Sequence, residues 1–497
     1  MRKINKVLIA NRGEIALRVI QSCKEKNIAT VAVYSRPDAA SPHVLAADES
    51  VFIGEAASSD SYLVGEKIID AAKKTGADAI HPGYGFLSEN SSFAKLCLEN
   101  EINFIGPDPH AIELMGDKTR ARELMAKAGV PYPPGTQSAM QDVERAKSIA
   151  EEIGYPVLIK AAAGGGGKGM RIVYKKEEFE KSVKAAKSEA KNAFGDDRVY
   201  IEKYLEEPRH IEFQILADTH GNVVHLFERE CSIQRRHQKV IEEAPSSVLT
   251  PELREKMGQA AVEAARACSY IGAGTVEFLI DKYLNYYFLE MNTRLQVEHP
   301  VTELITGLDL VSLQLEIAEG KVLPFTQEDL EMNGHAIECR IYAEDPANNF
   351  LPSTGLLTRH RIPAGNGIRV DAGVEEGQEV TINYDPMISK LCAHAENREQ
   401  AINRMLRALS EYQISGVRTT IPFCEFTLKH PAFSSGKFDT HFVQDHFTIS
   451  EDLGKEELEL FSVVSSLLKN SAQTPTNSSD SEQVSKTRET LWWANRR

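Results

Sequence analysis

Polar side chains occupy every second position from Glu290 to Glu298. Successive side chains of an extended chain point to opposite faces, so these residues share one face if the segment is a strand. The polar face then carries Glu290, Asn292, Arg294, Gln296 and Glu298, and the other face Met291, Thr293, Leu295 and Val297. A solvated edge strand has the same alternation, so the pattern alone leaves a functional and a purely structural interpretation open.

The residues that precede this segment favour the functional interpretation. Stretches 275–280 and 287–292 flank the polar stretch 281–286 as a hairpin would, and symmetric pairing places Glu277 opposite Glu290. The other face then sets Val276, Phe278 and Ile280 against Tyr287, Leu289 and Met291. Two carboxylates facing each other across a ladder repel unless a cation compensates them. With the oxygen of Asn292, they predict a Mg²⁺ or Mn²⁺ site shared with substrate phosphates.

The remaining polar positions predict chemistry on a small anion. Arg294 can hold a planar anion with its forked guanidinium. Glu298 can act as a general base on that anion if the two lie within hydrogen-bond reach. A metal, an anion clamp and a base together indicate phosphoryl transfer from ATP to a carboxylate-like acceptor.

A glycine run at residues 164–169 follows a predicted strand that ends in Lys160. Glycines let backbone amides approach phosphate oxygens without interference from a Cβ atom. A Walker A loop is excluded because residue 162 is Ala and residue 169 is Gly. The GxGxxG pattern fits at 164, 166 and 169, but any glycine run satisfies it. A phosphate-binding loop and a mobile surface loop both remain open, and Lys160 favours the first.

The elements that must position these residues alternate strands with helices. In the first 115 residues we predict strands 6–10, 31–34, 79–80 and 104–105 and helices 14–25, 64–74 and 91–99. This order indicates a parallel sheet with right-handed crossovers. A second unit has helices 117–128, 141–153 and 177–193 and strands 157–160, 171–174 and 199–203. A third section surrounds a helix at 251–268, and a smaller module follows with strands 335–343, 368–372 and 379–382 and a helix at 398–412.

Composition excludes several classes of protein. The 497 residues predict two to four domains, and 57 basic against 72 acidic residues give a net charge of −15, which disfavours binding to nucleic acid or an anionic membrane. The seven cysteines are scattered without a CxxC pair, so we expect reduced thiols rather than disulfides or zinc. No signal peptide and no apolar stretch of membrane-spanning length is visible, which predicts a cytoplasmic protein.

Several runs, taken in order, resemble the biotin carboxylase family. They include Ile-Ala-Asn-Arg-Gly-Glu at 9–14, His-Pro-Gly-Tyr-Gly-Phe-Leu-Ser-Glu-Asn at 81–90, Met-Gly-Asp-Lys at 115–118, Glu-Lys-Tyr-Leu at 202–205 and Gln-Arg-Arg-His-Gln-Lys at 234–239. The glycine run, residues 290–303, Glu-Cys-Arg at 338–340 and Tyr-Asp-Pro-Met at 384–387 extend the resemblance over about residues 1–447. Lys168 stands where many relatives carry Arg, which keeps the charge.

The resemblance implies an α/β (α+β) protein of the ATP-grasp fold. The expected parts are a Rossmann-like parallel-sheet domain at 1–116, an ATP-grasp domain at 117–333 with a mobile lid at about 131–203, and a C-terminal biotin carboxylase domain at 334–447. A partly flexible extension follows at 448–497, with a linker-like composition at 471–486, a short amphipathic helix at 456–468 and a tryptophan pair at 492–493.

The resemblance also implies an activity and its residues. A biotin carboxylase is a ligase that uses ATP, about two Mg²⁺ or Mn²⁺ ions and bicarbonate to carboxylate biotin by way of carboxyphosphate. The implied ATP-binding residues are Lys118, Lys160, Gly166, Gly167, Glu202, Lys203, Leu205, His210, Gln234, His237, Glu277 and Glu290. Glu277, Glu290 and Asn292 match metal ligands; Lys239, Arg294, Gln296 and Val297 the bicarbonate site; Arg340 and Tyr84 the biotin site. The implied catalytic residues are Arg294, Glu298, Lys239 and Arg340, with Glu298 as base and Arg340 stabilising the biotin enolate.

The sequence contains no Ala-Met-Lys-Met biotinylation site and no carboxyltransferase module after residue 447. The expected partners are therefore a separate biotin carboxyl carrier protein, a second copy of this chain and a carboxyltransferase subunit. The first half-reaction of acetyl-CoA carboxylase in fatty acid biosynthesis is favoured, with pyruvate or propionyl/acyl-CoA carboxylase as the alternative. Another ATP-grasp ligase that phosphorylates bicarbonate, as in carbamoyl phosphate synthesis, and a silent ATP-binding regulatory subunit remain alternatives.

Overall fold

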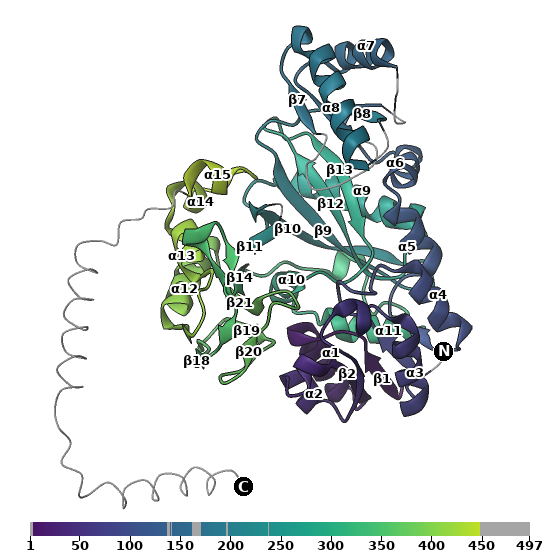
Figure 1. The fold of residues 1–497 in the computed structure, drawn as a ribbon, viewed down its shortest axis with the longest axis vertical. Helices are drawn as coiled ribbons and strands as arrows, with labels where there is room; N and C mark the ends of the chain where they lie inside the picture. The colour runs from purple at the N-terminus through teal and green to yellow at the C-terminus, as the bar shows by residue number, and fades with distance from the viewer. Residues whose placement is uncertain are drawn as a thin grey trace, which may run out of the picture. The chain divides into compact units, whose positions relative to one another are not determined.

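A computed structural model describes residues 3–136, 140, 142–161, 170–194, 197–236 and 238–447. Residues 1–447 form one compact unit, shown in Figure 1. Within the described residues, no helix combines the length and apolar character that crossing a bilayer requires. The predictions made for 448–497 lie outside the described residues.

The N-terminal part is a five-stranded sheet in the order β3-β2-β1-β4-β5, and every neighbouring pair is parallel. The predicted parallel α/β arrangement is confirmed. Its elements are β1 (Lys6–Ile9), α1 (Gly13–Glu25), β2 (Ala29–Ser35), α2 (Pro42–Ala46), β3 (Glu49–Gly54), α3 (Gly65–Thr75), β4 (Ala79–His81), α4 (Ser91–Glu99), β5 (Asn103–Phe104) and α5 (Pro109–Gly116). Helices α2 and α5 and the edge strand β3 were not predicted; most side chains of β3 are at least partly exposed.

The next part is an antiparallel three-stranded sheet, β7-β6-β8, covered by helices (top of Figure 1). Its elements are α6 (Lys118–Lys127), α7 (Val143–Ile153), β6 (Val157–Ala161), β7 (Arg171–Val173), α8 (Phe179–Phe194) and β8 (Val199–Lys203). Phe179 and Val183 of α8 pack with Val157 and Ile159 of β6 in a small core of their own. All six elements agree with the prediction to within two residues.

An eight-stranded antiparallel sheet forms the centre of the unit, in the order β13-β12-β9-β10-β11-β14-β21-β19. Its strands are β9 (Arg209–Ala217), β10 (Val223–Arg235), β11 (Gln238–Ala244), β12 (Gly272–Ile280), β13 (Tyr286–Asn292), β14 (His335–Tyr342), β19 (Ile368–Ala372) and β21 (Met387–Ala395). Helix α9 (Pro251–Ala267) packs on β9 and β10, and α12 (Arg398–Glu411) packs on β14 and β21. Because β11 pairs with β14, the strands of the smaller C-terminal module continue the central sheet.

Shorter elements complete the unit. They are α10 (His299–Thr306), α11 (Leu310–Ala318), β15 (Glu344–Asp345), β16 (Leu351–Pro352), β17 (Gly355–Leu356), β18 (Arg359–Arg361), β20 (Glu379–Val380), β22 (Gln413–Ser415), α13 (Ile421–Lys429), α14 (Pro431–Ser434) and α15 (Phe442–His446). A core of buried apolar side chains from β11, β14, β21, α12 and α13 holds the C-terminal module together. Strand β21, which carries much of that core, was not predicted.

Two details of the predicted hairpin are wrong. Pairing places Glu277 opposite Glu290 as expected, but a bulge follows, and Phe278 pairs with Phe288 rather than with Leu289. Leu289 is the additional residue and is partly exposed. The strand also ends at Asn292 rather than continuing to Glu298; α10 starts at His299, with Pro300 in its first turn and Glu298 as its N-cap residue.

Candidate active site

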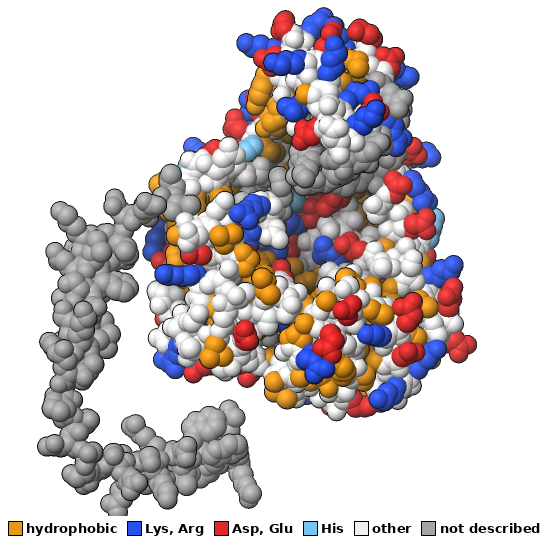
Figure 2. All heavy atoms as spheres, viewed as in Figure 1, with side chains coloured by type: hydrophobic (Ala, Val, Ile, Leu, Met, Phe, Trp, Pro, Cys, Tyr) orange, Lys and Arg blue, Asp and Glu red, His pale blue; other side chains and the backbone are white. Residues whose placement is uncertain are grey.

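A large cavity of about 1170 Å³ opens between the N-terminal part, the three-stranded sheet and the central sheet. In the space-filling view it is a hollow that contains acidic and basic side chains (Figure 2). Its lining includes every predicted site residue that lies within the described side chains: Tyr84, Lys160, Glu202, Lys203, Leu205, His210, Gln234, Lys239, Glu277, Glu290, Asn292, Arg294, Gln296, Val297, Glu298 and Arg340.

Four predicted residues cannot be placed. Gly166, Gly167 and His237 lie outside the described residues. Lys118 is the first residue of α6, and its side chain is not among the described side chains. The roles implied for these four residues remain predictions.

The ammonium group of Lys239 is the centre of the polar floor of the cavity. It donates to Glu298 Oε1 at 2.7 Å and to Glu277 Oε1 at 2.8 Å, and it also bonds Glu212. Gln296 Oε1 lies 3.3 Å away. One cation buried on β11 therefore gathers three carboxylates from β9, β12 and the start of α10.

Burial and charge pairing act in opposite directions on this floor. Desolvation lowers the pKa of Lys239, but the three carboxylates outweigh it and hold the pKa well above its usual value. Burial raises the pKa of Glu298, yet Lys239, Arg340 and Arg229 together lower it far below its usual value. Glu298 is thus an ionised carboxylate in a cavity, which is the state a general base requires.

Arg340 approaches Glu298 from the other side. Its Nη2 donates to Glu298 Oε2 at 2.9 Å and its Nε to Glu242 Oε1 at 2.6 Å. Glu242 lies on β11, directly opposite Glu338 on β14, and both carboxyls are fully buried. Burial raises the pKa of Glu242 to about 7 despite the neighbouring Arg340. Glu242 was not among the predicted site residues.

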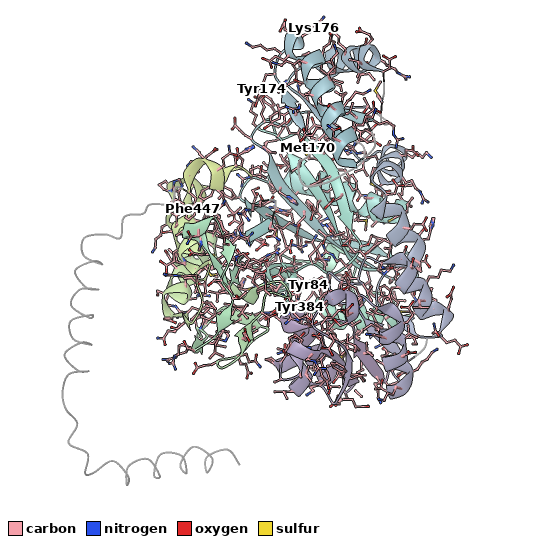
Figure 3. All side chains as sticks on the ribbon, viewed as in Figure 1. Tyr84, Met170, Tyr174, Lys176, Tyr384 and Phe447 are labelled. Atoms are coloured by element: carbon pink, nitrogen blue, oxygen red, sulfur yellow. The ribbon has the colours of Figure 1, made fainter. Side chains whose placement is uncertain are left out.

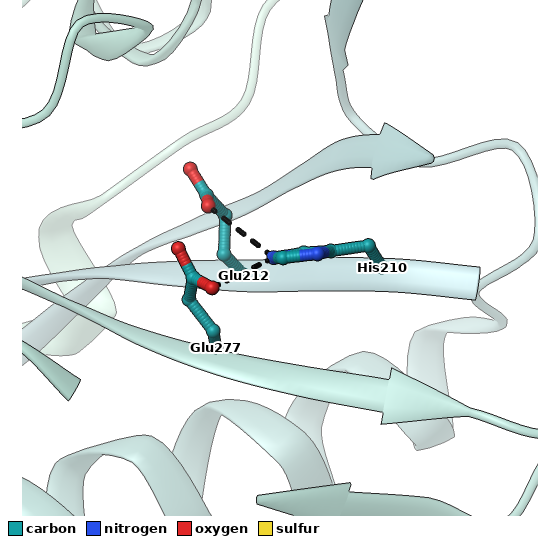
Figure 4. A group of neighbouring side chains, drawn as sticks. All are labelled: His210, Glu212 and Glu277. Atoms are coloured by element: carbon teal, nitrogen blue, oxygen red, sulfur yellow. Dashed lines mark ion pairs between the residues drawn. The ribbon is translucent and has the colours of Figure 1, made fainter. Parts of the chain in front are cut away.

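A second cluster joins His210, Glu212 and Glu277, whose ligand atoms lie within 4.8 Å of one another (Figure 4). His210 Nε2 lies 2.9 Å from Glu277 Oε2, and His210 Nδ1 lies 3.0 Å from Gln234 Nε2. Behind it, the fully buried Arg229 donates to Glu212 at 2.5 Å. Glu212 and Arg229 were missed, although the alternation of polar His210, Glu212 and Gln214 with apolar neighbours on β9 was a readable signal.

The residues of segment 293–298 that are predicted to bind bicarbonate lie close together even though this segment is not a strand. Gln296 Nε2 donates to Glu277 Oε1 at 3.1 Å, and Arg294 Nη2 donates to Asn292 Oδ1 at 3.1 Å. Arg294 is oriented by Glu89, whose carboxylate accepts from Nε at 2.8 Å. The predicted shared face is therefore replaced by side chains that turn toward one another from an irregular segment.

The upper wall comes from the three-stranded sheet. Lys160 Nζ lies 2.5 Å from Glu202 Oε2, and Arg122 pairs with the other carboxylate oxygen. Burial opposes ionisation of Glu202, but these two cations keep its pKa below the usual value. Lys203 is bonded to the carbonyls of Gly154 and Tyr155. This wall can present cationic groups to an anionic ligand.

The oxygen donors at the hairpin suit a hard divalent cation. Glu277 and Glu290 face each other across β12 and β13, and Asn292 Nδ2 donates to Glu277 at 2.9 Å. All three line the cavity, and two carboxylates with an amide oxygen are the donor types that Mg²⁺ prefers. The sequence predicts repulsion between Glu277 and Glu290. In the structure Lys239 and His210 lie against Glu277 and offset that repulsion, and the sequence pattern did not indicate these two partners.

Three family profiles match the chain in succession. Residues 3–112 match "Biotin carboxylase, N-terminal domain", residues 117–326 match "Carbamoyl-phosphate synthase L chain, ATP binding domain" and residues 338–445 match "Biotin carboxylase C-terminal domain". Together they cover most of the chain.

Curated relatives carry related names. A pyruvate carboxylase component of Methanothermobacter thermautotrophicus is 55% identical over 89% of this chain and 90% of its own length. Biotin carboxylase 1 of Bacillus subtilis is 54% identical over 89% of this chain and 99% of its own length. The mitochondrial alpha chain of methylcrotonoyl-CoA carboxylase from Dictyostelium discoideum is 55% identical over 90% of this chain, but the chain spans 64% of that relative's length.

A solved structure matches closely as well. It is the biotin carboxylase domain dimer of Hydrogenobacter thermophilus 2-oxoglutarate carboxylase, in complex with MgADP, ADP and bicarbonate. The TM-score is 0.83 and the identity 53%, over 90% of this chain and 98% of that one.

Proposed function

The chain belongs to the biotin carboxylase family, and from this premise we propose that it carboxylates biotin held on a separate carrier protein. The reaction converts ATP, bicarbonate and carrier-bound biotin into ADP, phosphate and carboxybiotin on the carrier. The single observation that supports this proposal most is the convergence of Lys239, Glu298 and Arg340 in one cavity. A buried ionised base held between two cations is suited to an anionic substrate that must lose a proton.

Within this proposal, Arg294, Lys239, Gln296 and the backbone at Val297 bind bicarbonate. Glu298 accepts the bicarbonate proton while a bicarbonate oxygen attacks the γ-phosphorus of ATP and ADP leaves, which yields carboxyphosphate. Carboxyphosphate releases CO₂ and phosphate; the phosphate takes the proton from N1 of biotin, and N1 then bonds to the CO₂ carbon. Arg340 stabilises the negative charge that develops on the biotin ring, and Tyr84 lies beside that ring.

The nucleotide would lie against the wall formed by Lys160, Glu202, Lys203 and Leu205, with His210 and Gln234 at its inner end. Lys118, Gly166, Gly167 and His237 are assigned to the same ligand on the family resemblance. Glu277, Glu290 and Asn292 would hold Mg²⁺ or Mn²⁺, which would neutralise phosphate charge during transfer.

The acceptor of the carboxyl group is a finer proposal. We infer the first half-reaction of acetyl-CoA carboxylase in fatty acid biosynthesis, with a split pyruvate carboxylase or a propionyl/acyl-CoA carboxylase as the alternative. The relatives include a free-standing biotin carboxylase, a pyruvate carboxylase and an acyl-CoA carboxylase, which supports keeping all of these acceptors. The proposed partners are a biotin carboxyl carrier protein, a carboxyltransferase and a second copy of the chain, in the cytoplasm.

The test is ATP hydrolysis by the full chain with Mg²⁺, with and without bicarbonate and free biotin. We expect hydrolysis to require both Mg²⁺ and bicarbonate and to rise with biotin, with carboxybiotin as product. Turnover of similar size without bicarbonate would refute the proposal, and stimulation by ammonia instead of biotin would favour carbamoyl phosphate synthesis. Arg294→Ala should abolish carboxylation and leave ATP affinity largely unchanged; full activity would contradict the role of Arg294.

A further inference from the structure

Lys390 is a fully buried lysine that bridges three separate parts of the chain. It lies on β21, and its ammonium group donates to the carbonyl of Val297 at 2.9 Å. The same nitrogen lies 3.2 Å from Glu14 Oε2 on α1 and 3.7 Å from Asp371 Oδ2 on β19. An ammonium group without water is costly unless its partners stay in place, so these distances are strongly constrained.

Glu14 connects this lysine to a cavity residue. Its Oε1 accepts the hydroxyl proton of Tyr84, while Oε2 faces Lys390. Tyr84 lies where the N-terminal part meets the central sheet (Figure 3), and it lines the cavity. Asn11 Nδ2 holds the loop of Tyr84 through the carbonyls of Pro82 and Tyr84, at 2.7 Å each. Asn11 therefore anchors the backbone of Tyr84, and Glu14 is the side-chain partner of its hydroxyl group.

The other end of the bridge is the backbone next to the base. Segment 293–298 has no strand ladder, because β13 ends at Asn292 and α10 begins at His299. Its position therefore depends on side-chain bonds such as the one from Lys390 to Val297. The neighbouring residue, Glu298, is fixed in turn by Lys239 and Arg340. A shift of the ammonium group would move the carbonyl and, with it, this carboxylate.

We propose that Glu14 and Lys390 are positioning residues that couple the biotin ring at Tyr84 to the bicarbonate site at Val297 and Glu298. When the biotin ring binds against Tyr84, the hydrogen bond from the Tyr84 hydroxyl to Glu14 changes. Because Glu14 also pairs with Lys390, the position of Lys390 then changes as well. Burial raises the pKa of Glu14 to about 7, although Lys390 lowers it. The coupling is reciprocal: bicarbonate at Val297 must favour biotin at Tyr84 by the same factor. This inference rests on the proposed function.

The test compares bicarbonate-dependent ATP hydrolysis by the full chain without and with free biotin. In Glu14→Gln, the amide still accepts from Tyr84 but no longer carries the charge that pairs with Lys390. We expect the ratio of biotin-stimulated to basal hydrolysis to fall by about tenfold, within the range of known coupling energies. Glu228→Gln is the matched control, because Glu228 is equally buried, pairs with Arg254 and lies away from the cavity.

Tyr84→Phe breaks the same link at its other bond and keeps the buried charges. If the link is continuous, the losses of biotin stimulation in Glu14→Gln and Tyr84→Phe are not additive in the double variant. Additive losses, or stimulation at the wild-type level in Glu14→Gln, would overturn the inference. The proposed function fails separately, when the wild-type chain shows no biotin stimulation and forms no carboxybiotin.

Discussion

Arg340 and Glu242 form the back of the active site: Nε of Arg340 lies 2.6 Å from Glu242 Oε1, on the side away from Glu298. One guanidinium is therefore held between two buried carboxylates. Since the bond to Glu242 fixes the plane of the guanidinium, it also fixes where Nη2 can reach. Glu242 thus orients Arg340 without contacting the cavity itself.

We expect Glu242→Gln to lower the rate of biotin carboxylation by about tenfold, because Arg340 keeps a hydrogen-bond acceptor but loses the negative charge of its partner. ATP affinity should not change, since Glu242 is absent from the nucleotide wall. The measurement is kcat for carboxybiotin formation beside Kd for ATP. The control is Glu243→Gln: this neighbouring carboxyl is equally buried but pairs with His335 and Arg398. Equal losses in the two variants would rule out a specific role.

Buried histidines should make the protein sensitive to mild acid. Desolvation lowers the pKa of His43, His81 and His225 to about 4 in each case. The unfolded chain takes up these protons near pH 6.5 and the folded chain does not, so stability is lost as the pH falls from 6.5 to 4. Each histidine accounts for up to about 3 kcal/mol of that loss.

Urea unfolding midpoints at pH 7 and pH 5 measure this effect. His225→Gln cannot titrate, and we expect it to lose less stability than the wild type over that interval. Glu14 and Glu242 act in the opposite sense, because their raised pKa values of about 7 favour the folded state as the pH falls from 7 to 4.5. Both proteins contain Glu14 and Glu242. Subtracting the stability loss of His225→Gln from that of the wild type therefore cancels the contribution of these two carboxyls. If the wild type and His225→Gln lost the same stability between pH 7 and pH 5, this would show that His225 is solvated.

Much of this site could be predicted because its polar residues interrupt apolar patterns. Hairpin symmetry predicted that Glu277 lies opposite Glu290, and this pairing is confirmed; alternation along the strand predicted Asn292 on the same face. The bulge at Leu289 could not be predicted, since Leu289 is apolar like Phe288 before it and the pattern does not show which of the two is the added residue. The irregular course of 293–298 was also missed, because alternation is the same for a strand and for a loop whose side chains converge.

The supporting residues were hidden for a different reason. Glu14, Glu242 and Lys390 act through partners that are far away in sequence, and a charged residue on a helix or strand is usually solvated. Their burial arises only when β11, β14 and β21 join one sheet and α1 packs beside it. Long-range pairing of this kind leaves no local signature.

Glu89 is expected to contribute modestly to anion binding. Its carboxylate orients Arg294 at 2.8 Å, but both side chains are partly exposed, and such pairs contribute about 0.2–1 kcal/mol. Glu89→Gln should therefore raise KM for bicarbonate by about two- to fivefold and change kcat little. Steady-state kinetics with bicarbonate as the varied substrate measure this. An unchanged KM for bicarbonate in Glu89→Gln would contradict the proposed link between Glu89 and Arg294.

Arg229 is expected to be essential for stability rather than for binding. Its side chain is fully buried and donates to Glu212, Gln214, Thr275 and Thr302. Arg229→Met leaves Glu212 with Lys239 as its remaining cation and removes the donors of three other groups. Breaking a buried pair costs about 3–5 kcal/mol, so the urea midpoint should fall strongly. Arg266→Met, which breaks an exposed pair with Glu263, serves as the control. It should change the free energy of unfolding by less than about 0.5 kcal/mol. Equal shifts in the two variants would mean that Arg229 is compensated by water, and the central sheet would then hold a hydrated polar layer.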